Sequence, residues 1–189
     1  PEEGMPLVIW FLECVKFADP DSWSMENVVP VRKRLPEGTP SVILNSADFG
    51  VAQTRRRCFA GEGWVANPTH SKEEWLGVID VLPHLNELLE GKLVINTAGG
   101  GASNSRRVNS QDSIIENPSK TIHNNTPSIR TDKPEKIRSL IIQETMILQG
   151  FSPDYDLTEA NTQKARWTMI GNAVVPAVGK AVIEGIECR

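Results

Sequence analysis

A polar segment at residues 96–130 divides a chain whose two flanks carry helix and strand patterns. It is rich in Gly, Ser, Asn and Thr, includes Gly99-Gly100-Gly101 and Arg106-Arg107, and has few apolar residues at a regular spacing. A stretch of this length without secondary structure of its own is uncommon inside a compact domain. The segment therefore predicts either a long functional loop region or a small separate subdomain.

The flank before this segment alternates between helical and extended patterns. Apolar residues recur at helical spacing over residues 6–18, and the helix should end at Asp19 because a residue before proline avoids helical backbone angles. Short apolar runs predict three strands, at residues 23–29, 41–45 and 57–60. Residues 71–74 fit a capping box, which predicts a helix that runs to about residue 83.

Helical patterning returns after the polar segment, over residues 137–148, and stops at Gly150. A last helix is expected from about Pro176 to Ile186. Strands that alternate with helices indicate an α/β layer, with the polar middle segment inserted into it.

Composition excludes several classes of protein. The chain has 189 residues, 39% of them hydrophobic and 23% charged, with a net charge of -4, which is typical of a soluble globular protein with a core. No apolar run approaches the roughly 20 residues that span a bilayer, and the acidic Pro1-Glu2-Glu3 start does not resemble a signal peptide. We therefore expect a cytoplasmic protein without a membrane partner, in which any polyanion binds to a local basic patch.

Cysteine and histidine are sparse and scattered. Cys14, Cys58 and Cys188 are widely spaced, without a Cys-x-x-Cys pair, and the three histidines are scattered as well. This pattern favours reduced structural thiols and predicts no metal site.

Three short motifs carry the candidate chemistry, and the first contains Glu26 at the end of a predicted strand. Ligands bind at strand ends in open α/β sheets, although an ordinary surface glutamate explains the residue equally simply. The second is Gln53-Thr54-Arg55-Arg56-Arg57. In an extended chain Arg55 and Arg57 share one face, which suits a polyanion or a carbonyl oxygen, and the alternative is a solvated basic strand.

The third motif is Gly171-Asn172-Ala173-Val174, which leads into the last predicted helix. A turn at a helix start offers free backbone N–H groups to a carboxylate or phosphate. A plain junction between a loop and a helix is the alternative.

The order of these motifs resembles the later motifs of the DNA cytosine-5 methyltransferase family. The matching run is Glu26-Asn27-Val28, then Phe49-Gly50-Val51 with Gln53-x-Arg55-x-Arg57, then Glu144 with Gln149-Gly150-Phe151, then Gly171 to Val174. The resemblance covers roughly residues 6–185. It implies an α/β fold: the C-terminal part of a Rossmann-like S-adenosylmethionine-dependent methyltransferase domain with a small inserted target-recognition subdomain.

The resemblance also implies a division of the chain and a role for each motif. Residues 1–92 would form part of the catalytic domain, residues 93–136 the target-recognition region, and residues 137–189 a return to the catalytic domain. Glu26 would hydrogen-bond N3 and the exocyclic amine of a flipped cytosine, and Arg57, with Arg55 nearby, would hold its O2 and the adjacent DNA backbone.

Further roles concern the cofactor and the DNA. S-adenosylmethionine would bind at Gly171, Asn172, Ala173 and Val174. Double-stranded DNA would contact the recognition region, through polar side chains that include Arg106, Arg107 and Thr121.

The chain departs from the family pattern at the nucleophile. The family uses a cysteine preceded by proline, upstream of the Glu-Asn-Val motif, whereas the three cysteines here follow Glu13, Arg57 and Glu187. The family's Phe-x-Gly-x-Gly cofactor motif has one counterpart, at residues 59–63, and its position after the arginine motif indicates coincidence.

We therefore expect a C-terminal portion or subunit that requires an N-terminal methyltransferase portion, on the same original chain or on a partner. A prokaryotic or phage origin, nucleoid association and a link to restriction-modification fit this hypothesis. The alternatives are a catalytically inactive, sequence-specific DNA-binding remnant or regulator, and an unrelated α/β domain.

Overall fold

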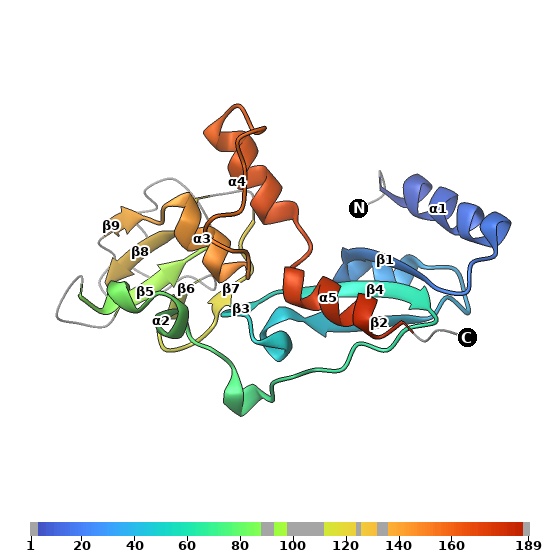
Figure 1. Cartoon of the computed structure of the whole chain (residues 1–189), viewed down its shortest axis with the longest axis horizontal. Helices are drawn as coiled ribbons and strands as arrows, with labels where there is room; N and C mark the ends of the chain where they lie inside the picture. The colour runs from blue at the N-terminus through green and yellow to red at the C-terminus, as the bar shows by residue number, and fades with distance from the viewer. Residues whose placement is uncertain (1–3, 88–92, 98–111, 124–125, 132–135, 187–189) are drawn as a thin grey trace. The chain divides into compact units, whose positions relative to one another are not determined.

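The structure is a computed structural model of the chain, and it describes residues 4–87, 93–97, 112–123, 126–131 and 136–186. The chain folds into two compact units (Figure 1). Unit 1 is built from residues 1–44, 56–67 and 178–189, and unit 2 from residues 45–55 and 68–177. Each unit therefore brings together segments that are distant in the sequence.

Unit 1 contains a three-stranded sheet in which β4 (Arg56–Glu62) lies between β1 (Trp23–Val28) and β2 (Ser41–Asn45). β1 and β4 are antiparallel, with Glu26 opposite Phe59 and Val28 opposite Arg57. The central strand carries three consecutive buried residues, Cys58, Phe59 and Ala60. The three strands predicted for this part of the chain are confirmed, and the first gives way after Val28 to the short 3-10 helix η1 (Val29–Arg34).

The helices of unit 1 also follow the sequence pattern. α1 (Met5–Ala18) ends at Asp19, whose left-handed φ of 45° stops the helix directly before Pro20. α5 (Pro176–Glu184) belongs to unit 1 from Val178 onward and buries Val178 and Val182, one helical turn apart. Both helices were expected from the sequence, and both predictions are confirmed.

The Phe-x-Gly-x-Gly counterpart forms β4 and the turn that follows it, and packing explains its glycines. A Cβ atom at Gly61 would lie 2.1 Å from the carbonyl oxygen of Trp23 on the neighbouring strand. Gly63 has a φ of 76°, a conformation that favours glycine. The two glycines therefore serve strand packing and a turn.

Unit 2 contains a four-stranded sheet in the order β6-β5-β8-β9, and its three strand pairs are antiparallel. The strands are β5 (Leu93–Asn96), β6 (Asp112–Ile114), β8 (Ser128–Thr131) and β9 (Lys136–Ser139). A separate parallel pair joins β3 (Gln53–Thr54) to β7 (Ser119–Lys120). The polar middle segment thus contains strands, and its residues 98–111 lie outside the described residues.

The core of unit 2 is formed by apolar residues that its strands and short helices share. They include Val78, Leu82, Leu85, Leu93, Ile95, Ile122, Ile129, Leu140 and Leu148. A second cluster joins Met146 of α3 (Ile142–Leu148) to Ile170 of α4 (Gln163–Asn172), together with Leu157. These contacts fix the C-terminal part of unit 2 around the two helices.

The helix predicted over residues 71–83 is interrupted, so this prediction is wrong as a continuous helix. The capping contact exists, because the Ser71 N–H donates to Glu74 Oε2 at 2.8 Å, but only the 3-10 turn η3 (Lys72–Glu74) follows it. The chain is extended at Gly77, where a Cβ atom would lie 2.5 Å from the Glu116 carbonyl oxygen. A new turn, α2 (Val78–Val81), starts there, and the 3-10 helix η4 (Pro83–Glu87) follows it.

The helix predicted over residues 137–148 is wrong in its first part. Residues up to Ser139 form β9, because they pair with β8, with Ile129 opposite Arg138. α3 starts later, where the Ile141 N–H donates to Glu144 Oε2 at 2.9 Å. Strand pairing across the sheet overrides the local helical pattern.

α4 is a helix that the sequence patterns did not predict. Its start is marked by Thr162, whose hydroxyl accepts a hydrogen bond from the Ala165 N–H at 3.0 Å. Gly171 and Asn172 are its last two residues, so the prediction that they form a turn at a helix start is wrong. The C-terminal end of a helix has carbonyl groups, and not N–H groups, without a partner inside the helix.

The mixture of helices and strands is compatible with an α/β methyltransferase fold. The Rossmann-like assignment, the inserted subdomain and the three domain boundaries remain predictions. Within the described residues no helix is long and apolar enough to cross a membrane, and no group of three His, Cys, Asp or Glu side chains is arranged to hold a metal ion.

Candidate active site

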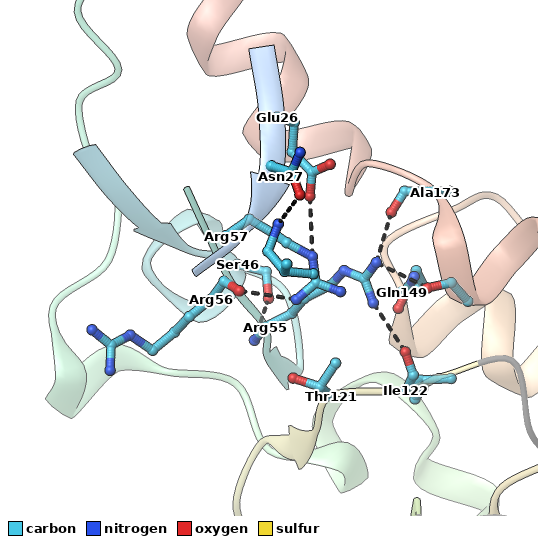
Figure 2. A network of polar contacts seen from close by, with 12 residues as sticks. Glu26, Asn27, Ser46, Arg55, Arg56, Arg57, Thr121, Ile122, Gln149 and Ala173 are labelled. Atoms are coloured by element: carbon cyan, nitrogen blue, oxygen red, sulfur yellow. Dashed lines mark hydrogen bonds and ion pairs between the residues drawn. The ribbon is translucent and has the colours of Figure 1, made fainter. Parts of the chain in front are cut away.

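Glu26 of β1 and Arg57 of β4 form an ion pair within unit 1. The Arg57 Nε atom lies 3.0 Å from Glu26 Oε1 (Figure 2). The strand register explains the contact, because Val28 lies opposite Arg57, and Glu26, two residues along β1, points to the same face. The Glu26 and Arg57 side chains keep 22% and 18% of their surface exposed, so a ligand can reach the pair.

The surroundings of this pair affect its charges and the neighbouring thiol. Burial lowers the pKa of Arg57 from its usual value, and the charge of Glu26 acts against that decrease. Burial raises the pKa of Cys58, the charge of Arg32 opposes the rise, and the charge of Glu26 adds to it. Cys58 is 1% exposed, so it is a protonated packing residue and not a nucleophile.

Arg55 has a different environment, although it stands only two residues before Arg57. It is 3% exposed, and its guanidinium donates to three backbone carbonyl groups within unit 2. Two of the acceptors are Ile122 at 2.9 Å and Ala173 at 3.2 Å (Figure 2). The third is Gly171 at 2.9 Å. Arg56 is exposed, and Figure 2 shows its side chain pointing away from both neighbouring arginines.

The predicted cofactor residues lie where α4 ends. Gly171 is buried, Ala173 is half-buried, and the side chains of Asn172 and Val174 are exposed. The Ala173 N–H is occupied by the Met169 carbonyl oxygen at 3.1 Å. The accessible groups here are therefore the two exposed side chains.

The predicted DNA contacts are only partly within the described residues. Thr121 is half-buried, and its hydroxyl donates to the Thr54 carbonyl oxygen at 3.0 Å. This bond continues the pairing of β7 with β3 by one residue. Arg106 and Arg107 lie outside the described residues.

Two fully buried glutamines were not predicted to have a role. Gln53 Nε2 donates to Gln149 Oε1 at 2.8 Å, and Gln149 Nε2 donates to the Ile170 carbonyl oxygen at 2.6 Å. The Ile122 N–H donates to Gln53 Oε1 at 3.4 Å. Both glutamines belong to the motifs on which the family resemblance rests, and these motifs were the sequence signal for a role. The motifs do not show that the two side chains contact each other.

Glu144 forms a second ion-pair cluster, with Arg138 and His84. Arg138 donates to both carboxylate oxygens, at 2.7 and 2.5 Å, and the His84 ring lies 2.8 Å from Oε1. Burial alone would raise the pKa of Glu144, but the hydrogen bonds from Arg138, His84 and the Ile141 N–H outweigh it and hold that pKa at about 2. This carboxylate is thus a structural charge at the start of α3.

Comparison with known proteins decides the family. The sequence profile of the C-5 cytosine-specific DNA methylases matches residues 64–188, which is more than half of the chain. The chain belongs to the C-5 cytosine-specific DNA methylase family. The family expected from the sequence is therefore confirmed, and members of this family depend on S-adenosylmethionine.

This methylase chain is also similar to the type II methyltransferase M1.HphI of Haemophilus parahaemolyticus. The two are 26% identical over 223 aligned residues, an alignment that includes 93% of the chain and 59% of the relative. The methylase chain thus spans about three fifths of the relative's length.

Proposed function

We propose that the chain is the base-holding and DNA-reading portion of a DNA cytosine-5 methyltransferase, which transfers a methyl group to C5 of a flipped cytosine. The observation that carries the proposal is the accessible ion pair of Glu26 and Arg57, with 3.0 Å between Nε and Oε1, in a member of the cytosine methylase family. A carboxylate beside a guanidinium offers an acceptor and donors side by side. That combination matches the edge of a cytosine, which carries an amine, a ring nitrogen and a carbonyl oxygen.

Each member of the pair has its own task on the base. Glu26 accepts a hydrogen bond from the exocyclic amine with one carboxyl oxygen and delivers a proton to N3 from the other, and Arg57 donates to O2. When a nucleophile adds to C6, negative charge develops on the ring, and these contacts neutralise it in place. The ion pair between the two side chains keeps both oriented before the base arrives, which limits the reorganisation needed during the reaction.

The end of α4 fits a role in holding S-adenosylmethionine. The Asn172 amide both donates and accepts hydrogen bonds, Val174 adds apolar surface, and both side chains are exposed. When bound, the cofactor supplies the methyl group. The exposed side chains of Asn172 and Val174 would orient it, and the backbone of Gly171 and Ala173, which is already hydrogen-bonded within the protein, would hold these two side chains in place.

The nucleophile of this reaction is a cysteine thiolate from an N-terminal methyltransferase portion, on the same original chain or on a partner. The two cysteines in the described residues do not fit that task, because Cys58 is buried with a raised pKa and Cys14 follows Glu13 on α1. The exposed apolar side chains of α1, such as Trp10 and Phe17, form the kind of surface that a second portion covers. The thiolate adds to C6, C5 accepts the methyl group, and the C5 proton then passes to a base or to water as the C5–C6 double bond re-forms and the thiolate leaves.

The test is a mixing experiment. The chain is combined with an N-terminal portion that carries the proline-cysteine motif, labelled S-adenosylmethionine and a cytosine-containing duplex. Methyl incorporation that requires both portions supports the proposal. The absence of incorporation by a pair that forms a stable complex would contradict it.

A catalytically inactive DNA-binding remnant or regulator is the second candidate, favoured by the absence of any proline-cysteine pair in the sequence. It predicts sequence-dependent binding of double-stranded DNA by the chain alone, with an affinity that falls steeply as salt increases. It also predicts no incorporation in the mixing experiment. A base-polarising pair such as Glu26 and Arg57 has no task in a pure binder, and we therefore prefer the enzyme.

The biological setting follows from the same proposal. A DNA substrate places the protein at the nucleoid in the cytoplasm of a prokaryote, or of a phage-infected cell. Its similarity to a type II methyltransferase suggests a role in restriction-modification.

A further inference from the structure

Ile122 is bound by two side chains that reach both of its backbone groups. The Arg55 guanidinium donates to its carbonyl oxygen at 2.9 Å, and its N–H donates to Gln53 Oε1 at 3.4 Å. Gln53, Arg55 and Ile122 are all buried. The hydroxyl of the neighbouring Thr121 donates to the carbonyl oxygen of Thr54, which lies between Gln53 and Arg55.

The same side chains also bind the end of α4. The last carbonyl groups of a helix have no partner inside the helix, and here Arg55 donates to those of Gly171 and Ala173. Gln149 donates to the Ile170 carbonyl oxygen and accepts from Gln53. A cation at this position also complements the negative end of the helix dipole.

A guanidinium is suited to this task because its donors form a rigid planar fork. Its two terminal nitrogens here reach carbonyl groups on two segments that are about 50 residues apart in the sequence. A lysine ammonium is a single point of charge, and it cannot span the same three acceptors. Arg55 therefore acts on two segments at once.

We propose that Gln53, Arg55 and Gln149 are positioning residues, which hold the Thr121-Ile122 segment and the end of α4 in one fixed arrangement. The ligands of these segments, DNA at Thr121 and S-adenosylmethionine at Asn172, rest on the proposed function. Arg55 thus serves the reaction by orienting two binding segments, while Arg57 contacts the base.

Amide hydrogen exchange of the chain tests the network without any activity. Arg55→Lys should increase the exchange rates of the Ile122 and Ala173 amides by about tenfold or more, because their segments lose a shared anchor. The β1 and β4 amides should change much less. Arg56→Lys is the matched control, since Arg56 is the exposed neighbour in the same motif.

Gln149→Met is a second variant for the exchange experiment, and it replaces Arg55→Lys if that variant does not fold. It removes the donor to Ile170 while keeping a side chain of similar length, and it should loosen the same two segments. Exchange rates at Ile122 and Ala173 that are unchanged in a folded variant would overturn the proposal.

Kinetics of the completed enzyme provide the second readout. Well below the unfolding temperature, Arg55→Lys should raise KM for S-adenosylmethionine and weaken DNA binding several-fold, with a smaller change in kcat. A large decrease in kcat with KM unchanged would make Arg55 a catalytic residue and overturn the proposal. If the wild-type mixture has no activity, the proposed function fails, and the exchange experiment still decides the network.

Discussion

Arg55 and Arg57 are two residues apart in one motif and each donates to a backbone carbonyl group, yet they differ in burial and in their remaining partners. Arg57 pairs with a carboxylate and keeps 18% of its side chain exposed, whereas Arg55 is 3% exposed and donates to three carbonyl groups. A buried guanidinium that binds backbone groups fixes the fold around it. A partly exposed guanidinium beside a carboxylate remains available to a ligand. One short motif therefore combines a structural anchor with a candidate catalytic group.

Glu144, which is buried, and Glu26, which is half-buried, show a similar contrast. Glu144 is bound by Arg138, by His84 and by a backbone N–H, and only 5% of its side chain is exposed. Glu26 keeps 22% of its side chain exposed. Glu144 is therefore the more buried of the two carboxylates, and Glu26 keeps more surface for a ligand.

The largest expected effect is on catalysis. Glu26→Gln should lower kcat of the completed enzyme by about 10²-fold or more, because an amide cannot supply the proton that N3 takes up as negative charge develops on the ring, while DNA binding changes by less than about threefold. Single-turnover methylation and DNA titration measure the two quantities. Glu62→Gln, at the exposed end of β4, is the control. Equal losses in methylation rate and in DNA affinity would contradict a catalytic role for Glu26.

Acid stability should depend on Glu144. Its pKa of about 2 in the folded chain lies below its usual value of 4.5. The stabilisation is therefore fully present above about pH 4.5 and is lost as the pH falls toward 2. The free energy of unfolding should decrease by about 3 kcal/mol over this range. Denaturant unfolding at a series of pH values measures it. Glu144→Gln should flatten this dependence, and a variant that retains the wild-type slope would show that other groups cause it.

A smaller effect is expected at Gln149. Gln149→Met should lower the free energy of unfolding by about 1–3 kcal/mol, because the Ile170 carbonyl group loses its buried donor. Gln143→Met is the matched control, since Gln143 is exposed on the same helix, and it should change stability by less than about 0.5 kcal/mol. Similar losses in both variants would argue against the buried network.

Local patterns predicted those parts of the fold that local physics determines. The apolar runs predicted β1, β2 and β4, and Pro20 predicted the end of α1. The errors lie where distant segments meet. Gly77 must leave room for the Glu116 carbonyl group, and Arg138 is held in a strand by its pairing with Ile129.

The motifs of the candidate site could be found in the sequence, whereas the contacts between their side chains could not be predicted from it. The order of the motifs indicated the family, whereas the roles given to Glu26 and Arg57 remain predictions. The sequence could not separate Arg55 from Arg57, because nothing in the motif specifies which side chain is buried. Nor could it predict that Gln53 meets Gln149, 96 positions away in the sequence.

Arg55 anchors the structure around it, whereas Arg57 is kept accessible to a ligand. Thermal unfolding of the chain alone, with Arg55→Met and Arg57→Met compared at pH 7, tests this difference most directly. Arg55→Met leaves three carbonyl groups without their donor and should lower Tm by about 6 °C or more, whereas Arg57→Met should lower it by less than about 3 °C. Equal decreases, or a larger decrease for Arg57→Met, would contradict the account.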